Sequence, residues 1–169
     1  MRQLYHLAAL LLAASALAAG ANAQGYSKPG FLVTGRVYCD TCRAGFETNA
    51  SHSIPGAVVQ MECRHFETNE LHHKAEATTD AQGWYKMEVG EDHQEEICEV
   101  ALLRSPEKDC AEIEKSRDRC RVPLTRNNGI KQSGVRYANP IAFFRKEPLA
   151  NCGDVLRKYD LYDETSENS

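Results

Sequence analysis

The sequence predicts an all-β fold, an antiparallel β-barrel or sandwich of about seven strands that is stapled by disulfides. Short alternations of apolar and polar residues recur along the chain with turn residues between them, and this pattern is typical of half-buried strands. The second observation is the presence of seven cysteines in 169 residues, which favours a disulfide framework if the protein is secreted.

The first 23 residues are expected to be a secretory signal. A short basic start precedes an apolar stretch over residues 7–18, which is too short to span a bilayer, and residues 21–23 have the small-x-small form of a cleavage site. We therefore expect a secreted protein of the extracellular space. Residues 24–169 are expected to form a single β domain whose acidic tail is mobile from about residue 163.

Residues 31–39 are the first expected strand, because apolar side chains occupy one face while Thr34 and Arg36 occupy the other. Gly35 interrupts the apolar face and indicates a bulge or a close backbone approach. A turn at residues 54–57 then leads to a second strand, in which Val59, Met61 and Cys63 alternate with polar residues.

Two further runs are expected to form a hairpin. Residues 74–79 are a weaker strand candidate, residues 80–83 resemble a turn, and residues 84–89 alternate strongly. Residues 96–103 are the most apolar strand.

The last part of the sheet is expected within residues 135–144. Asn139-Pro140 interrupts this run, so it predicts either a strand pair or one kinked strand, because proline cannot donate to a central ladder. Residues 110–121 are charged and irregular, with room for a short helical turn but no clean apolar stripe.

The composition argues against several classes of function. The net charge is −4 and the basic residues are scattered, which makes nucleic acid and anionic membranes poor partners. G-x-S-x-G, H-E-x-x-H and glycine-rich phosphate motifs are absent from the sequence, and carboxylate pairs such as Glu95-Glu96 lie in charged stretches. We therefore expect no catalytic residues, no cofactor and no enzymatic activity.

The pair Cys39-Asp-Thr-Cys42 raises the question of a redox or zinc site. No helical pattern follows Cys39, as a redox pair requires, and two cysteines three positions apart on a strand lie roughly 10 Å apart, too far for one bond. A zinc site would need a second ligand pair.

The histidines are not expected to supply that pair. His72 and His73 are adjacent and would point to opposite faces of a strand, and the others (His52, His65 and His93) stand alone in polar surroundings, as solvated histidines do. No metal site is therefore expected.

The positions of two cysteines predict one bridge directly. Cys63 is in phase with the apolar residues of its strand and Cys98 is in phase with those of its own, so both thiols point into the same core. A Cys63–Cys98 bond would close a loop of about 35 residues and contribute roughly 4 kcal/mol.

Two surface features are candidate sites. Asn49-Ala-Ser51 is an N-glycosylation sequon in a polar loop. Trp84 lies opposite Tyr85 on its strand, which leaves its ring exposed to stack on carbohydrate, together with Tyr38.

The chain resembles the Ole e 1-like secreted plant proteins, and within them most closely the grass pollen group 11 allergens. The resemblance extends from about residue 31 to residue 162. It is carried by "VTGRVYCDTCRAGFETNAS", "IPGA", "KAEATTDAQGWYKMEV", "DHQEEICEV" and "RVPLTRNNGIKQSGVRYANPIAFFRKEPL".

The resemblance implies a compact antiparallel barrel or sandwich, secretion, abundance in pollen and recognition by IgE in sensitised people. It also implies three disulfides, Cys39–Cys110, Cys42–Cys152 and Cys63–Cys98. Cys120 departs from the family pattern and would be the free thiol, available for dimerisation or mispairing.

Three functions are compatible with these features. The first is an extracellular interaction protein in pollen hydration, germination or tube growth, a role that the resemblance implies, with a receptor-like kinase ectodomain or a cell-wall polymer as partner. The second is a module that binds cell-wall carbohydrate through Trp84. The third is a protease inhibitor that presents a basic residue on residues 103–108 or 126–131.

Overall fold

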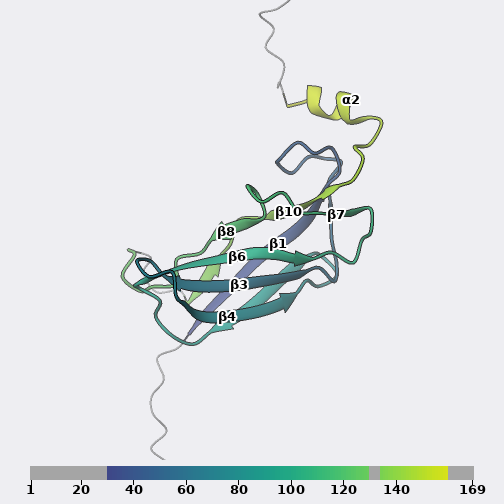
Figure 1. The fold of residues 1–169 in the computed structure, drawn as a ribbon. Helices are drawn as coiled ribbons and strands as arrows, with labels where there is room; N and C mark the ends of the chain where they lie inside the picture. The colour runs from purple at the N-terminus through teal and green to yellow at the C-terminus, as the bar shows by residue number, and fades with distance from the viewer. Residues whose placement is uncertain (1–29, 130–133, 160–169) are drawn as a thin grey trace, which may run out of the picture.

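Ten strands and one short helix make up the part of the chain that the structure describes, residues 30–129 and 134–159 of a computed structural model. The strands form two sheets packed face to face, and the helix lies beyond one end of them (Figure 1). The all-β sandwich prediction is confirmed. The expected signal and the expected mobile tail lie outside the described residues.

The first sheet is built around β1 (Phe31–Asp40). The other strands of this sheet are β2 (His52–Ser53), β5 (Trp84–Val89), β7 (Cys110–Glu112), β9 (Val135–Tyr137) and β10 (Ile141–Arg145). β5 and β2 run antiparallel to β1, whereas β9 and β10 run parallel to it, so this sheet is mixed rather than wholly antiparallel. The break at Asn139-Pro140 separates β9 from β10, which makes this run a strand pair.

The second sheet is wholly antiparallel, with the order β4-β3-β6-β8. Its strands are β3 (Val58–His65), β4 (Leu71–Thr78), β6 (Glu96–Arg104) and β8 (Arg119–Arg121). Residues of β3 and β6 alternate between buried and partly exposed, so one face of this sheet covers the core and the other faces outward.

The core lies between the two sheets. Val37 and Tyr85 from the first sheet and Met61 and Val100 from the second are at most 1% exposed. Gly35 marks a close approach, as predicted, because a Cβ atom there would lie 2.6 Å from Cζ of Tyr85. The Tyr85 ring therefore occupies the space in front of Gly35.

The expected hairpin of residues 74–79 and 84–89 is wrong. β4 pairs with β3 in the second sheet and β5 pairs with β1 in the first, so the connection between them crosses from one sheet to the other. Thr79 holds this crossing, because its Oγ1 donates to the Ile54 carbonyl at 2.6 Å and accepts from the Ala57 amide at 2.9 Å. Two alternating runs joined by a turn do not reveal whether they share a sheet.

The structure has more strands than the expected seven because β2, β7 and β8, each only two or three residues long, were not predicted. β2, β7 and β8 are too short to show a period-two pattern, and β7 and β8 lie in the segment expected to be irregular. The helix α2 (Cys152–Arg157) was not expected either. Its buried residues, Cys152 and Val155, pack with Cys42 in a small second core.

Candidate interaction surfaces

Three disulfides cross-link the sandwich, and they are the pairs that the resemblance implies: Cys39–Cys110, Cys42–Cys152 and Cys63–Cys98. Cys63 and Cys98 face each other directly across β3 and β6 and are both buried, as their phase predicts. Cys39 ties β1 to β7, two strands away in the same sheet. Cys42 ties the end of β1 to α2.

Asp40, between the first two cysteines, organises the chain where β1 ends. Its carboxylate is fully buried and accepts the backbone N–H groups of Cys42, Ala44 and Gly45 at 3.2, 3.1 and 2.7 Å. A buried carboxylate is tolerated when its oxygens are satisfied in this way. Cys39-x-x-Cys42 thus lies at a folded corner in which each cysteine has its own partner.

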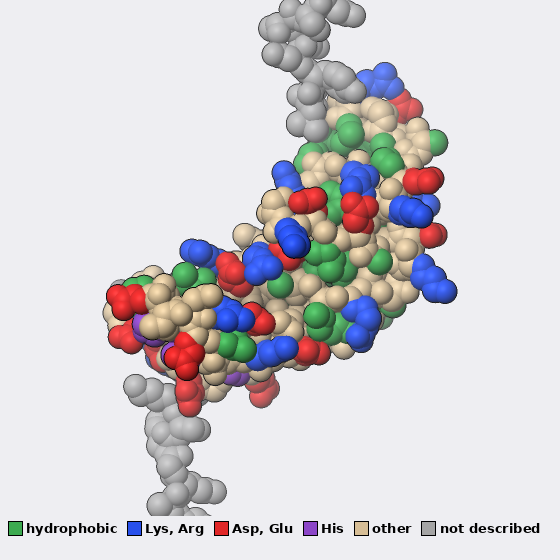
Figure 2. Space-filling model, in the orientation of Figure 1, with side chains coloured by type: hydrophobic (Ala, Val, Ile, Leu, Met, Phe, Trp, Pro, Cys, Tyr) green, Lys and Arg blue, Asp and Glu red, His purple; other side chains and the backbone are tan. Residues whose placement is uncertain are grey.

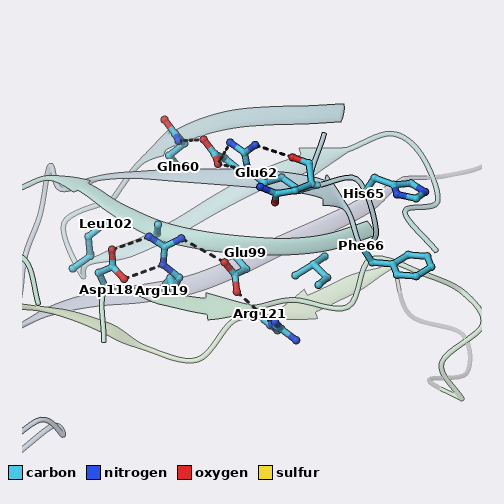
Figure 3. Close-up of a pocket in the computed structure, with 13 residues that line it drawn as sticks. Gln60, Glu62, His65, Phe66, Glu99, Leu102, Asp118, Arg119 and Arg121 are labelled. Atoms are coloured by element: carbon cyan, nitrogen blue, oxygen red, sulfur yellow. Dashed lines mark hydrogen bonds and ion pairs between the residues drawn. The ribbon is translucent and has the colours of Figure 1, made fainter. Parts of the chain in front are cut away.

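A groove of about 480 Å³ runs over the outer face of the second sheet (Figure 3). Outward side chains of β3, β6 and β8 form its floor, and the segment after β3 forms one end. The lining residues are Gln60, Glu62, Arg64, His65, Phe66, Asn69, Ile97, Glu99, Ala101, Leu102, Asp118, Arg119 and Arg121. Phe66 at the end of the groove is 57% exposed.

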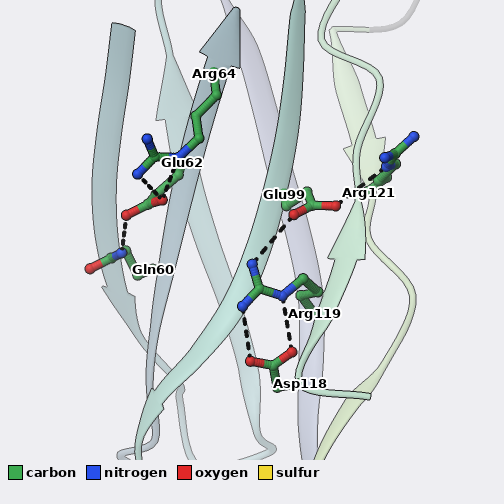
Figure 4. A network of polar contacts seen from close by, with 7 residues as sticks. All are labelled: Gln60, Glu62, Arg64, Glu99, Asp118, Arg119 and Arg121. Atoms are coloured by element: carbon green, nitrogen blue, oxygen red, sulfur yellow. Dashed lines mark hydrogen bonds and ion pairs between the residues drawn. The ribbon is translucent and has the colours of Figure 1, made fainter. Parts of the chain in front are cut away.

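Ion pairs order the charges of this groove, in one group on β3 and a second group that links β6 to β8 (Figure 4). Arg64 contacts Glu62 at 2.9 Å, and Arg119 contacts Asp118 at 3.0 Å. Glu99 joins β6 to β8 because it contacts both Arg119 at 3.5 Å and Arg121 at 3.3 Å. The pairs of Glu62 and Glu99 are partly exposed and stabilise the fold only slightly, so their main effect is to order the side chains. The Asp118 side chain is only 7% exposed, and it has Arg119 as its ion-pair partner.

Acidic and basic side chains are intermingled on this face rather than separated into patches of one sign (Figure 2). The hydrogen bonds that Arg119 donates to the Asp118 carboxylate are the main reason why the pKa of Arg119 lies above its ordinary value. Each groove carboxylate is paired with an arginine. The described lining residues include three arginines, three carboxylates and a histidine.

The groove network was not predicted from the sequence. Its residues occupy the outward positions of two predicted strands, which is a signal that could have marked a charged face. The pairing of those strands with β8 was not visible, because β8 is three residues long. Without that pairing, Arg119 and Arg121 could not be placed beside Glu99.

Trp84 is 42% exposed on the outer face of the first sheet, and Tyr137 on the same face is 76% exposed. Trp84 pairs with Arg36 and Tyr137 pairs with Thr34, so the two aromatic residues lie on opposite sides of β1. From strand spacing and rise, their Cα atoms are about 12 Å apart.

The prediction that Tyr38 stacks on carbohydrate together with Trp84 is wrong. Tyr38 is 5% exposed and lies beside Gly45 and Arg117. Burial, followed by the charges of Asp40 and Glu47, raises the pKa of its hydroxyl to about 12. The alternation of residues places Tyr38 on the outer face of its strand, but it does not show that other parts of the chain cover the ring.

Asn49 is exposed in a turn, and its backbone N–H donates to the Tyr159 hydroxyl at 2.9 Å. This position leaves the side chain on the surface. Glycosylation of Asn49 remains a prediction.

Cys120 is the free cysteine, and it is buried. It points inward from β8 toward Tyr85, and burial, opposed by weaker polar contacts, raises the pKa of its thiol to about 11. The expected dimerisation through Cys120 therefore does not fit the folded chain, because the thiol is covered and protonated.

Cys120 should accordingly react with a thiol reagent only after unfolding. In a DTNB assay of the oxidised protein at pH 8, we expect far less than one thiol per chain to react over minutes, and one thiol to react in 6 M guanidinium chloride. Rapid stoichiometric reaction of the native protein would show that Cys120 is accessible.

The histidines expected to stand alone are partly clustered, so that expectation is wrong. His93 is 6% exposed, and its Nδ1 lies 2.7 Å from Glu96. His72 reaches the other oxygen of the same carboxylate at 3.0 Å. The ring of His73 lies 5.4 Å from that of His93. Strand pairing brings these residues together, which their separation in the sequence concealed.

Glu96 should make stability depend on pH through this cluster. Burial opposes its ionisation, but the hydrogen bonds from His93 and His72 outweigh burial, so the pKa of Glu96 lies below its ordinary value of 4.5. Its contribution is therefore fully present above about pH 4.5 and is lost as the pH falls through the lowered pKa.

We expect Glu96→Gln to lower the free energy of unfolding at pH 7 by about 1.5 to 3 kcal/mol. Urea denaturation of both proteins between pH 7 and pH 3 tests this, and the difference between them should shrink below pH 4.5. A constant difference at all pH values would contradict the assignment.

The two loops considered for protease inhibition differ in the structure. Arg104 at the end of β6 is exposed. Arg126 lies over the Phe31 ring, with its guanidinium carbon 5.1 Å from the ring centre. Residues 130–131 of the second loop lie outside the described residues. The geometry adds no support to an inhibitory loop at Arg126.

The fold and these surfaces define a disulfide-cross-linked β-sandwich with a charged groove on one sheet face. None of the helices in the described part of the chain has the length and hydropathy needed to cross a membrane. A family model described as "Pollen protein Ole e 1 like" matches residues 29–160. The chain belongs to the Ole e 1-like family of pollen proteins.

Two relatives are grass pollen allergens. The chain is 68% identical over 135 residues to pollen allergen Phl p 11 of Phleum pratense, covering 80% of this chain and 94% of that protein. It is 68% identical over 131 residues to major pollen allergen Lol p 11 of Lolium perenne, covering 78% of this chain and 98% of that protein.

A solved structure supports the fold. The crystal structure of the major plantain pollen allergen Pla l 1 matches with a TM-score of 0.65 and 29% identity, over 73% of this chain and 99% of that chain. The resemblance to Ole e 1-like proteins and to the grass group 11 allergens is thus confirmed.

Proposed function

We propose that this chain is a secreted, non-enzymatic pollen protein that acts as an extracellular interaction protein in pollen hydration, germination or tube growth. The relatives named as pollen allergens support pollen as the tissue in which the protein occurs. The three disulfides support an oxidising, extracellular location. The observation that carries the proposal is the ordered, mixed-charge groove on β3, β6 and β8.

The groove is suited to a protein partner, such as the ectodomain of a receptor-like kinase. Arginine and aromatic residues are enriched at protein interfaces, and the groove supplies Arg64, Arg119 and Arg121 together with exposed Phe66. Alternating charges provide specificity for a surface of complementary pattern. A neutral wall polysaccharide offers no charges to match this network.

A double charge reversal in the groove tests this proposal. Labelled oxidised protein is applied to germinating pollen and to stigma tissue, beside the variant Arg119→Glu/Arg121→Glu. Both arginines are at least half exposed, but Arg119 is the partner of the buried Asp118, so circular dichroism must first show that the variant is folded. We expect the apparent affinity for the tissue to fall about tenfold or more, because the variant places like charges against Glu99 and against the partner.

Lys86→Glu is the matched control, because Lys86 is exposed on the other sheet. Its binding should equal that of the wild type. Brief trypsin treatment of the tissue should abolish binding, and treatment with wall glycanases should leave it intact. Undiminished binding of the groove variant, or loss of binding with glycanase alone, would count against a protein partner at the groove.

The second candidate function is binding of cell-wall carbohydrate, and the exposed pair Trp84 and Tyr137 favours it. Aromatic rings on one flat sheet face can stack on successive sugars of a polysaccharide chain. Both rings flank β1 on the same face.

This candidate predicts that Trp84→Ala and Tyr137→Ala each lower retention in affinity gels that contain wall glucans, pectin or arabinogalactan. Arg119→Glu/Arg121→Glu should leave retention unchanged. Absence of retardation of the wild type in all of these gels would remove the candidate.

The same proposal includes secretion of the protein by means of the signal over residues 1–23, and glycosylation of Asn49. Expression in plant cells, followed by treatment with an N-glycosidase, should lower the mass of the secreted protein, and Asn49→Gln should show no such shift. Relatives named as pollen allergens support recognition by IgE in sensitised people.

A further inference from the structure

The histidine cluster lies at one end of the second sheet, next to the end of the groove at His65, whose ring lies 5.8 Å from that of His72. His72, His73, His93 and Glu96 line a common pocket of about 520 Å³ with Glu91. His72 and His73 come from β4, Glu96 begins β6, and His93 precedes β6. Two stretches that are separate in the sequence, residues 72–73 and 91–96, thus supply imidazole and carboxylate groups to one place.

A break in the β3–β4 register explains why adjacent His72 and His73 both reach this pocket. Cys63 pairs with His73 and Arg64 pairs with Leu71, which leaves His72 as an extra residue on β4. An extra residue of this kind interrupts the alternation of side chains and redirects one of them. The expectation that these two histidines diverge therefore fails at this point.

Two nitrogens of the cluster lack any hydrogen-bond partner although they are buried, namely Nε2 of His73 and Nε2 of His93. The side chain of His93 is 5% exposed. A buried polar atom without a partner is uncommon and costs free energy, which indicates that a missing group completes it.

Glu96 selects the tautomer of the neutral imidazole ring that it contacts. Its carboxylate lies 2.7 Å from Nδ1 of His93 and accepts the Nδ1–H bond. A neutral imidazole carries one N–H, so the lone pair is left on Nε2. A histidine that binds a metal through one ring nitrogen usually donates the N–H of its other ring nitrogen to a carboxylate, a backbone carbonyl or water. The contact between His93 and Glu96 has this form.

We propose that His73 and His93 bind one Zn²⁺ ion through their Nε2 atoms, with Glu96 as the positioning carboxylate. Zn–N bonds of about 2.0 Å in a tetrahedral site place the two ring centres about 5 Å apart. The ring centres of His73 and His93 are 5.4 Å apart. Water and the nearby Glu91 carboxylate are available to complete the coordination.

The neighbouring disulfide does not belong to the ligand set. The Sγ atoms of Cys63 and Cys98 lie within 4.8 Å of ligand atoms of His93 and Glu96, but they are bonded to each other. Zinc binds thiolates, which this pair lacks while it is oxidised. The site therefore belongs to the folded, oxidised protein and needs no reduction.

Isothermal titration of the metal-free, oxidised protein with zinc chloride at pH 7.5 tests the site. We expect one Zn²⁺ per chain and no binding of Mg²⁺ or Ca²⁺, because both prefer oxygen ligands. His73→Gln and His93→Gln should each weaken binding at least tenfold, and Glu96→Gln should weaken it 10- to 100-fold.

His52→Gln is the matched control, since His52 pairs with Glu107 at 2.9 Å outside the cluster. It should bind zinc as the wild type does. His73 is only partly buried on an edge strand, so His73→Gln keeps the test valid if His93→Gln fails to fold. In ¹⁵N spectra of the imidazoles, zinc should shift Nε2 of His73 and His93 while Nδ1 of His93 stays protonated.

Three results would overturn the proposal. These are the absence of stoichiometric binding at 100 µM zinc, unchanged affinity in both His73→Gln and His93→Gln, and binding that occurs only after reduction of Cys63–Cys98. The last result would assign the metal to the thiolates instead of the imidazoles.

Discussion

Replacement of both Cys42 and Cys152 by alanine should lower the free energy of unfolding by about 4–5 kcal/mol. This disulfide spans 110 residues, and a cross-link that closes a longer loop removes more entropy from the unfolded chain. It also anchors α2 to the end of β1 through the small core that contains Cys42, Cys152 and Val155. Denaturation in guanidinium chloride under oxidising conditions measures the loss.

Two comparisons make this prediction specific. Removal of Cys63–Cys98, which spans 35 residues, should cost about 4 kcal/mol, slightly less than removal of the longer cross-link. Cys120→Ala removes a cysteine without removing a disulfide, so it serves as the control. A loss below about 1 kcal/mol for Cys42 and Cys152 would mean that other contacts hold this end of the molecule.

Gly35→Ala should lower the free energy of unfolding by about 3 kcal/mol. The added Cβ would lie 2.6 Å from Cζ of Tyr85 and 3.0 Å from Cβ of Ala138. The Tyr85 ring is 1% exposed and cannot move away without disturbing the core. Urea denaturation, with near-ultraviolet circular dichroism as the probe, gives the size of the effect.

A smaller side chain at position 85 should relieve this clash. Tyr85→Leu will itself be destabilising, but Gly35→Ala should cost less in that background than in the wild type, with a coupling of about 1 kcal/mol or more. If the effects of the two substitutions are additive, contact with the Tyr85 ring is not the source of the cost of Gly35→Ala.

Local patterns in the sequence predicted the long strands well. The alternation at Val59, Met61 and Cys63 identified β3, and the matching phase of Cys98 identified the bond between β3 and β6. Gly35 was recognised as a close approach because a glycine interrupts an otherwise apolar face. These features depend on residues within one strand, where period and face are visible in the sequence.

Features that depend on which strands are neighbours were not predictable in the same way. The run after Thr79 was read as a hairpin, although β4 and β5 belong to different sheets. The contacts of Glu99 with Arg119 and Arg121 require the pairing of β6 with a strand of three residues. The shared pocket of His72 and His73 requires a break in strand register, for which the sequence carries no local signal.

We propose that the outer face of β3, β6 and β8 is a recognition surface held in shape by the disulfide scaffold. The most direct test is the dissociation constant for the partner recovered from pollen or stigma, measured for wild type, Arg119→Glu/Arg121→Glu and Trp84→Ala/Tyr137→Ala. We expect the affinity to fall about tenfold or more in the groove variant and to be unchanged in the aromatic variant. The reverse pattern, with affinity lost only when Trp84 and Tyr137 are removed, would contradict the proposal and favour carbohydrate binding on the first sheet.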